Sequence, residues 1–210
     1  MRWIFVYFVI MSLSNILLIK ENQVSSYKSP NKLDIVSKLY YTSQSNNKNK
    51  IISVDNKIPQ VGIDLIKKFE GFKSESYTDP YTGELPITIG WGFTRRKDGT
   101  KFEKGDTMTH YEANELLNYK IEQHFLPSLE KIPYWNEMSS GKKGALLSFA
   151  YNLGANFYGS DGFNTITNHL KNKEWNLVAD ALYLYRNPGS SVEKGLARRR
   201  LAEGKAWKND

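Results

Sequence analysis

The chain has 210 residues, 40% of them hydrophobic and 13% aromatic, which is enough apolar material for a packed core and excludes a wholly disordered protein. It contains no cysteine, which excludes disulfides, thiolate metal sites and a cysteine nucleophile. The net charge is +7, but residues 1–59 hold eight Lys and Arg against three Asp and Glu, so most of the excess lies outside the region that we expect to fold. Because a nucleic-acid binder would carry that charge on its fold, we expect no nucleic acid as a partner.

The first segment, residues 1–20, has one Arg followed by an apolar run, which is the pattern of an export signal. Ser12 and Ser14 have the spacing for cleavage after Ser14. If it is not cleaved, the apolar run is at the short limit for a membrane-spanning helix. Residues 21–59 are rich in Asn, Ser, Lys and Gln and poor in apolar residues, which predicts a disordered polar linker.

The remaining residues, 60–210, are predicted to form one α+β domain. Apolar residues at helical spacing predict a short helix over 61–70 that ends at Gly71. Alternation over 87–91 and a turn at Asp98-Gly99 predict a small antiparallel sheet.

A mainly helical lobe follows the predicted sheet. Thr109 and Glu112 form a capping box before a helix through about Gln123. Further helices are predicted from Ser140 through the apolar run 145–153, and around 163–170, 175–184 and 192–206. A cleft between the sheet and the helices is natural in such a domain.

Glu70 is the candidate for acid chemistry. It ends an apolar helix, between Phe69 and Gly71-Phe72, near the negative end of the helix dipole. Apolar surroundings and this dipole both favour a protonated carboxyl, the form that a general acid requires. A surface Glu at a helix end is the alternative on local sequence alone.

Three separated motifs, in order, carry a resemblance to a known family. The first is FEGF at 69–72 with YTD at 77–79 and TIGWG at 88–92; the second is SFAYNLG at 148–154; the third is GLARRRLAE at 195–203. This pattern closely resembles the phage-type lysozymes (glycoside hydrolase family 24, the endolysin family) over roughly residues 61–207. The resemblance implies a lysozyme-like α+β fold.

The resemblance also implies the roles of four residues. Glu70 would donate a proton to the leaving glycosidic oxygen, Asp79 would activate the attacking water, and Thr88 would help to hold that water. Arg199 would pack against the acid and position it. The implied reaction is hydrolysis of the β-1,4 bond between N-acetylmuramic acid and N-acetylglucosamine in peptidoglycan, with inversion and without a cofactor or metal.

Aromatic side chains can stack on sugars, and they also fill hydrophobic cores. The candidates for stacking on sugar faces are Tyr77, Trp91 and Phe157, with core packing as the alternative for each. The three histidines (His110, His124 and His169) lack the spacing of metal ligands and are expected on the surface or on helix faces.

Two departures from the family pattern concern the site. Thr88 follows Asp79 by nine residues rather than the six of compact members, and the extra residues fall in a turn-rich loop where Glu84 is a possible substitute carboxylate. Phe93 stands where the family often has a His, which should change the shape of the cleft more than its chemistry.

Two other functions remain open at this stage. A lytic transglycosylase would use one Glu and no water, so Asp79 and Thr88 favour hydrolysis instead. A catalytically inactive peptidoglycan-binding module is favoured only by the longer loop. The expected partner is peptidoglycan, and the N-terminus could also attach the protein to a membrane. We expect export to the periplasm, the cell exterior or the outer face of the inner membrane. A monomer is the default expectation.

Overall fold

The computed structural model describes residues 57–78, 83 and 85–209. The predicted leader at 1–20 and nearly all of the predicted linker at 21–59 lie outside the described residues. The linker boundary needs a correction, because Ile58 and Pro59 are buried and Ile58 belongs to the hydrophobic core. The described domain therefore begins before Gln60, where the first helix starts.

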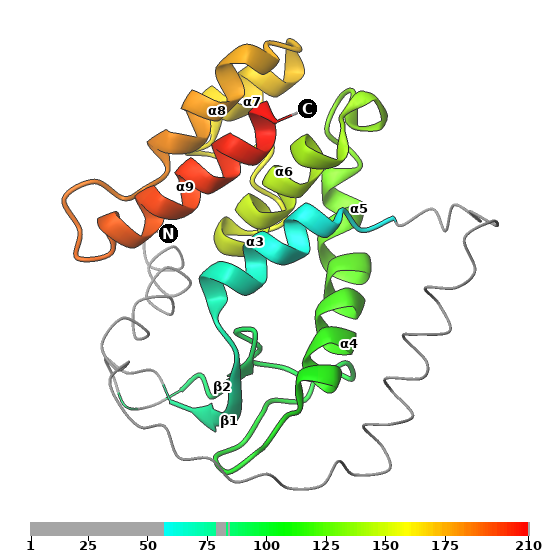
Figure 1. Ribbon diagram of the computed structural model, residues 1–210, viewed down its shortest axis with the longest axis vertical. Helices are drawn as coiled ribbons and strands as arrows, with labels where there is room; N and C mark the ends of the chain where they lie inside the picture. The colour runs from blue at the N-terminus through cyan, green and yellow to red at the C-terminus, as the bar shows by residue number, and fades with distance from the viewer. Residues whose placement is uncertain (1–56, 79–82, 84, 210) are drawn as a thin grey trace, which may run out of the picture. The chain divides into compact units, whose positions relative to one another are not determined.

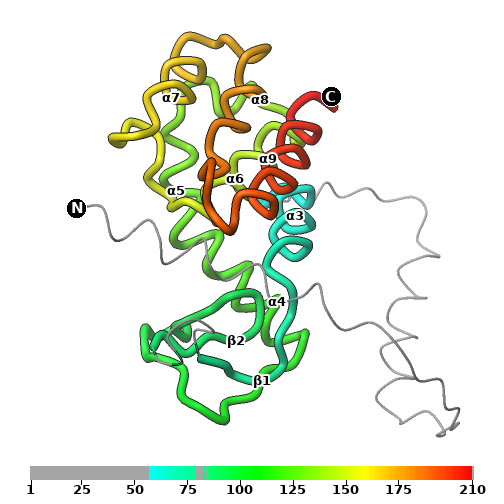
Figure 2. The backbone as a smooth tube through the Cα atoms, turned by 90° about the vertical axis from the view of Figure 1, so that its left-hand side faces the viewer, coloured from blue at the N-terminus to red at the C-terminus, as the bar shows by residue number. Residues whose placement is uncertain are grey.

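The described domain has a small antiparallel sheet and a larger group of helices, as the sequence predicts (Figures 1 and 2). Each predicted helix is present, with bounds that differ by a few residues. The longer elements are α3 (Gln60–Glu70), β1 (Lys73–Tyr77), β2 (Thr88–Gly90), α4 (His110–Lys120), α6 (Ser140–Leu153), α7 (Asn164–Lys171), α8 (Trp175–Leu184) and α9 (Glu193–Lys208). The shorter ones are a π-helical turn η2 (Ile121–Phe125), α5 (Leu126–Leu129) and η3 (Trp135–Glu137).

Strands β1 and β2 pair antiparallel, with Lys73 opposite Gly90 and Tyr77 opposite Thr88. The register shifts between these two pairs, so the five-residue strand bends along its three-residue partner. The predicted turn at Gly99 is present, and that glycine has a φ of 87°, which favours a residue without a Cβ atom.

Helix α6 forms the centre of the helical part. Its residues from Gly144 to Ala150 are all buried, because α3 and α9 pack against it from different sides (Figure 1). A helix that is apolar all round is expected in such a central position. The crossing of α3 and α6 depends on two glycines, since a Cβ atom at Gly144 would lie 2.7 Å from the Gly62 nitrogen. This close approach fixes α3, and with it the side chain at its end, against the core.

Helix α4 begins at the capping box of Thr109 and Glu112, with both reciprocal hydrogen bonds formed, and runs from the sheet toward the other helices (Figure 1). The prediction that this helix ends at about Gln123 is wrong. The helical backbone continues through η2 and α5 to Leu129, and the Leu126 N–H donates to the Ile121 carbonyl in an i→i+5 bond. The π turn inserts one extra residue into the helix where it passes the cleft described below.

Candidate active site

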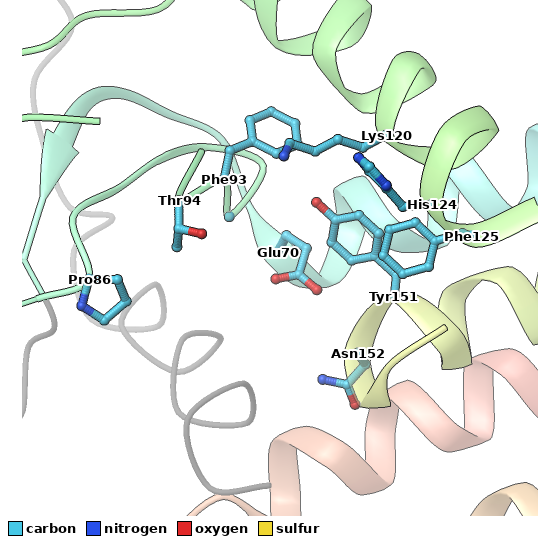
Figure 3. Close-up of a pocket in the computed structure, with 10 residues that line it drawn as sticks. Glu70, Pro86, Phe93, Thr94, Lys120, His124, Phe125, Tyr151 and Asn152 are labelled. Atoms are coloured by element: carbon cyan, nitrogen blue, oxygen red, sulfur yellow. The ribbon is translucent and has the colours of Figure 1, made fainter. Parts of the chain in front are cut away.

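A cleft of about 340 Å³ lies between the loop after β2 and the helices. Glu70 reaches it from the end of α3 (Figure 3). The loop contributes residues 92–94, the α4–η2 helix contributes Lys120, His124 and Phe125, and α6 contributes Tyr151 and Asn152. The sequence predicted this arrangement of sheet, helices and cleft.

Glu70 is held between a cation and a glycine. Arg199 Nη1 donates to Glu70 Oε1 over 2.6 Å, and the exposed fractions of the two side chains are 2% for Arg199 and 12% for Glu70. The other oxygen, Oε2, lies beside Gly92, where a Cβ atom would be only 3.3 Å away. Gly71, with a φ of 69°, ends α3 directly after the acid. Glu70 is thus a nearly buried carboxyl with one oxygen occupied and the other at the cleft.

A buried charge network supports this acid from behind. Arg199 Nε donates to Glu203 Oε1 over 3.3 Å, and Arg199 Nη2 donates to the Ser148 carbonyl over 3.0 Å. The Ser148 hydroxyl donates to the same Glu203 oxygen over 2.7 Å. Glu203 is completely buried, so water does not compete for its oxygens. Its hydrogen bonds therefore hold the arginine in one position. The predicted contact of Arg199 with the acid is therefore present, and Glu203 is a partner that the sequence did not reveal.

Arg200 extends the network to the cleft wall. Its Nη2 donates to Asn152 Oδ1 over 2.8 Å, and its Nε lies 3.0 Å from Glu203 Oε2. Burial lowers the pKa of Arg200 to about 10, although the charge of Glu203 opposes this shift. Each of the two buried arginines thus has at least one carboxyl group beside it, which is how buried cations are tolerated.

Two tyrosines lie near Glu70. The Tyr151 hydroxyl donates to the Trp91 carbonyl over 2.8 Å, and its ring stacks on Phe125 with centroids 5.2 Å apart. Burial, and then the negative charge of Glu70, raise the pKa of Tyr151 well above its ordinary value. The same two causes, in the same order, raise the pKa of Tyr77 to about 12. Both hydroxyls therefore stay neutral beside the acid at physiological pH.

Tyr77→Phe should make stability less sensitive to alkali between pH 10 and 12. The folded pKa of Tyr77, about 12, lies above its ordinary value of 10, so the unfolded chain releases this proton first. The stabilisation is complete below pH 10 and is lost as the pH rises toward 12. Urea unfolding at pH 8, 10, 11 and 12 measures the effect, with Tyr111→Phe at an exposed side chain as the control. Equal losses in wild type and Tyr77→Phe would contradict the assignment.

Of the two residues predicted to handle water, the structure describes only Thr88. Asp79 lies outside the described residues, as does Glu84. Thr88 is completely buried in β2, its hydroxyl lies 3.5 Å from the Pro86 carbonyl, and it does not line the cleft. The threonine that does line it is Thr94, whose hydroxyl lies on the Glu70 side of the cleft (Figure 3).

Two predictions of sugar-stacking residues are wrong. Trp91 is 7% exposed, packs against Phe72 and donates its indole N–H to Asn114 Oδ1 over 3.2 Å. Phe157 is 2% exposed and meets Phe149 edge to face, with centroids 4.9 Å apart. Both rings are core residues because neighbouring side chains cover the faces that a sugar would need. Tyr77 is partly exposed, and its contact with substrate stays a prediction.

Several residues that line the cleft were not singled out from the sequence as site residues. Lys120 belongs to a predicted helix that was given no role in the site, and Phe125 lies just beyond the predicted end of that helix. His124 was expected on the surface or on a helix face. Asn152 and Tyr151 lie inside the SFAYNLG motif, which could have indicated them. In the described part of the chain, no group of three or more His, Cys, Asp or Glu side chains could hold a metal ion. None of the described helices is long and apolar enough to cross a membrane.

Comparisons with known proteins agree with this architecture. The chain matches the phage lysozyme family model over residues 67–203. It is 33% identical over 147 residues to the endolysin of Lactococcus phage c2, covering 70% of this chain and 58% of that relative, so it spans less than two thirds of that protein's length. It is 29% identical over 141 residues to the endolysin of Salmonella phage P22, covering 66% of this chain and 90% of the relative.

The fold has a matching solved structure. The endolysin from Escherichia coli O157:H7 phage FAHEc1 aligns with a TM-score of 0.59 and 25% identity, covering 72% of this chain and 93% of that chain. The family model includes Glu70 and Glu203, the two carboxyls joined through Arg199. The chain therefore belongs to the phage lysozyme family.

Proposed function

We propose that this protein is a muramidase that hydrolyses the β-1,4 bond between N-acetylmuramic acid and N-acetylglucosamine in peptidoglycan. The observation that carries the proposal is the position of Glu70, a carboxyl 12% exposed at the wall of a cleft and fixed by a buried arginine. Membership of the phage lysozyme family supports it, as does similarity to proteins named endolysins.

In the proposed reaction, Glu70 is the general acid. Arg199 occupies Oε1, so the proton that passes to the leaving glycosidic oxygen is carried on Oε2, the oxygen beside Gly92 at the cleft. The bond to Arg199 keeps the Glu70 carboxyl in one orientation. The glycosidic oxygen of a bound glycan therefore always faces the same carboxyl oxygen, Oε2. The apolar walls formed by Phe93 and Phe125 exclude water from the proton-donating side.

The water side of the reaction is assigned to Asp79, which follows Glu70 by nine residues. Asp79 accepts a proton from the water as it attacks the anomeric carbon from the opposite face, which gives an inverted product. Thr88 is the proposed holder of that water by resemblance. Thr94 is a second candidate, because its hydroxyl lines the cleft and that of Thr88 does not. We also propose that residues 1–20 direct export, so that the protein acts on the cell wall.

Product analysis tests this proposal. Purified protein incubated with purified peptidoglycan should release new reducing ends, and mass spectrometry should find muramic acid ends that have gained one water. Anhydromuramyl ends would show a lytic transglycosylase instead. Binding to peptidoglycan without any new ends would show a non-catalytic module. The α-anomer as the first product would support inversion, and a β-anomer would contradict the water assignment.

A further inference from the structure

We propose that Lys120 and His124 form a subsite for a carboxylate carried by the glycan strand, so that the cleft selects anionic glycans over neutral ones. This inference rests on the proposed function and names the part of the substrate that the far wall of the cleft would bind.

The helix geometry brings both side chains to one wall of the cleft. Lys120 is the last residue of α4, and His124 follows four residues later, which places the two on the same helix face. Both side chains line the cleft, on the wall beyond Glu70 (Figure 3). The π turn lets Phe125 line the cleft as well, where it stacks on Tyr151. π turns inside α-helices are frequent at functional sites, because the extra residue redirects side chains.

Lys120 is a partly buried cation without a carboxylate partner among the described residues. Its ammonium lies 5.9 Å from the centroid of the Phe93 ring, which holds it at the cleft. Burial, and then the positive charge of Arg95, lower the pKa of Lys120. By contrast, the more deeply buried Arg199 and Arg200 each face a carboxylate. A partly desolvated cation that has no counter-ion in the described part of the chain is favourably placed to receive one from a ligand.

The charge balance of the cleft favours an anion at this wall. Among the described residues that line the cleft, the one carboxyl group is that of Glu70, and it is paired with Arg199. Lys120, with the positive charge of Arg95 near it, makes the opposite wall positive. A muramyl residue differs from the N-acetylglucosamine beside it by a lactyl ether. Its carboxylate is free in unsubstituted strands; in substituted strands it is a neutral amide, and the attached peptide carries carboxylates of its own. A charge-assisted hydrogen bond from Lys120, with a ring N–H of His124 as a second donor, would therefore distinguish a muramyl residue from N-acetylglucosamine.

The test compares two substrates and three variants of the full chain. The substrates are peptide-free glycan strands with their lactyl carboxylates free, and the same strands with those carboxylates converted to neutral amides. Lys120→Met should raise KM for the anionic strands about ten-fold or more and leave kcat within about two-fold, since the lost contact binds a remote group. Lys120→Arg should largely restore KM. Lys131→Met, at an exposed lysine, should match wild type.

The amidated strands separate recognition of charge from a structural role. On them, wild type and Lys120→Met should have the same KM. Equal KM values on the anionic strands, or equal increases on both substrates, would overturn the subsite. If wild type cleaves neither substrate, the proposed function fails instead. A further experiment compares intact cell walls with walls from which acid has removed the phosphate polymers. If the rise in KM caused by Lys120→Met disappears with the phosphates, the subsite binds phosphate and the carboxylate proposal is overturned.

Discussion

Glu70→Gln should reduce the release of reducing ends from peptidoglycan by a factor of about 10² to 10⁴. The amide has nearly the same shape as the carboxyl and still accepts a hydrogen bond from Arg199, but it cannot transfer a proton to the glycosidic oxygen. Because this contribution is made only in the transition state, we expect the loss in kcat and a KM near that of wild type. Initial rates over a range of substrate concentrations measure both constants.

A matched variant guards against a loss that comes from misfolding. Glu115→Gln makes the same chemical change on an exposed position of α4 and should keep full activity. Far-UV circular dichroism and thermal unfolding of both variants check the fold. Glu70→Asp adds a second comparison, because it keeps the acid but withdraws it by one methylene from the cleft, and it should fall between the other two. Wild-type turnover by folded Glu70→Gln would remove this residue from the mechanism.

The helices could be predicted from the sequence because their signals are local. The capping box at Thr109 and the glycine at 71 each act within a few residues of their own position, and the structure confirms both. The π turn after Lys120 gave no such signal. Its backbone geometry is compatible with ordinary helix-forming residues, and tertiary contacts such as that of Phe125 with Tyr151 accompany it.

The cleft could be predicted only in part, for a physical reason. The contact between Glu70 and Arg199 joins residues 129 positions apart, and no local pattern encodes it; the family resemblance did. Trp91 and Phe157 were wrong as sugar-binding residues because aromatic side chains serve cores and sugar sites with the same chemistry. His124 is exposed, as expected, but it is exposed at the cleft. Its place at the cleft could not be predicted, because the cleft forms only when segments distant in the sequence pack together.

Arg199→Met should lower the free energy of unfolding by about 3–5 kcal/mol, because it leaves buried carboxylates without one of their cations. Arg199 is 2% exposed and bridges Glu70 and Glu203, of which Glu203 is completely buried. Methionine fills much of the same volume, so the loss reports the missing charge and hydrogen bonds more than a cavity. Urea unfolding gives the free energy, and the melting temperature should fall by about 6–20 °C.

The adjacent arginine supplies the control for this change. Arg198 is exposed on the same turn of α9, so Arg198→Met removes the same charge from the chain and should change stability by no more than about 0.5 kcal/mol. Arg199→Lys should remain well below wild type, because an ammonium cannot reach Glu70, Glu203 and the Ser148 carbonyl in the fixed geometry of a guanidinium. If Arg199→Met were as stable as Arg198→Met, the network would not hold the acid, and the positioning of Glu70 would have to come from the end of α3 and Gly92 alone.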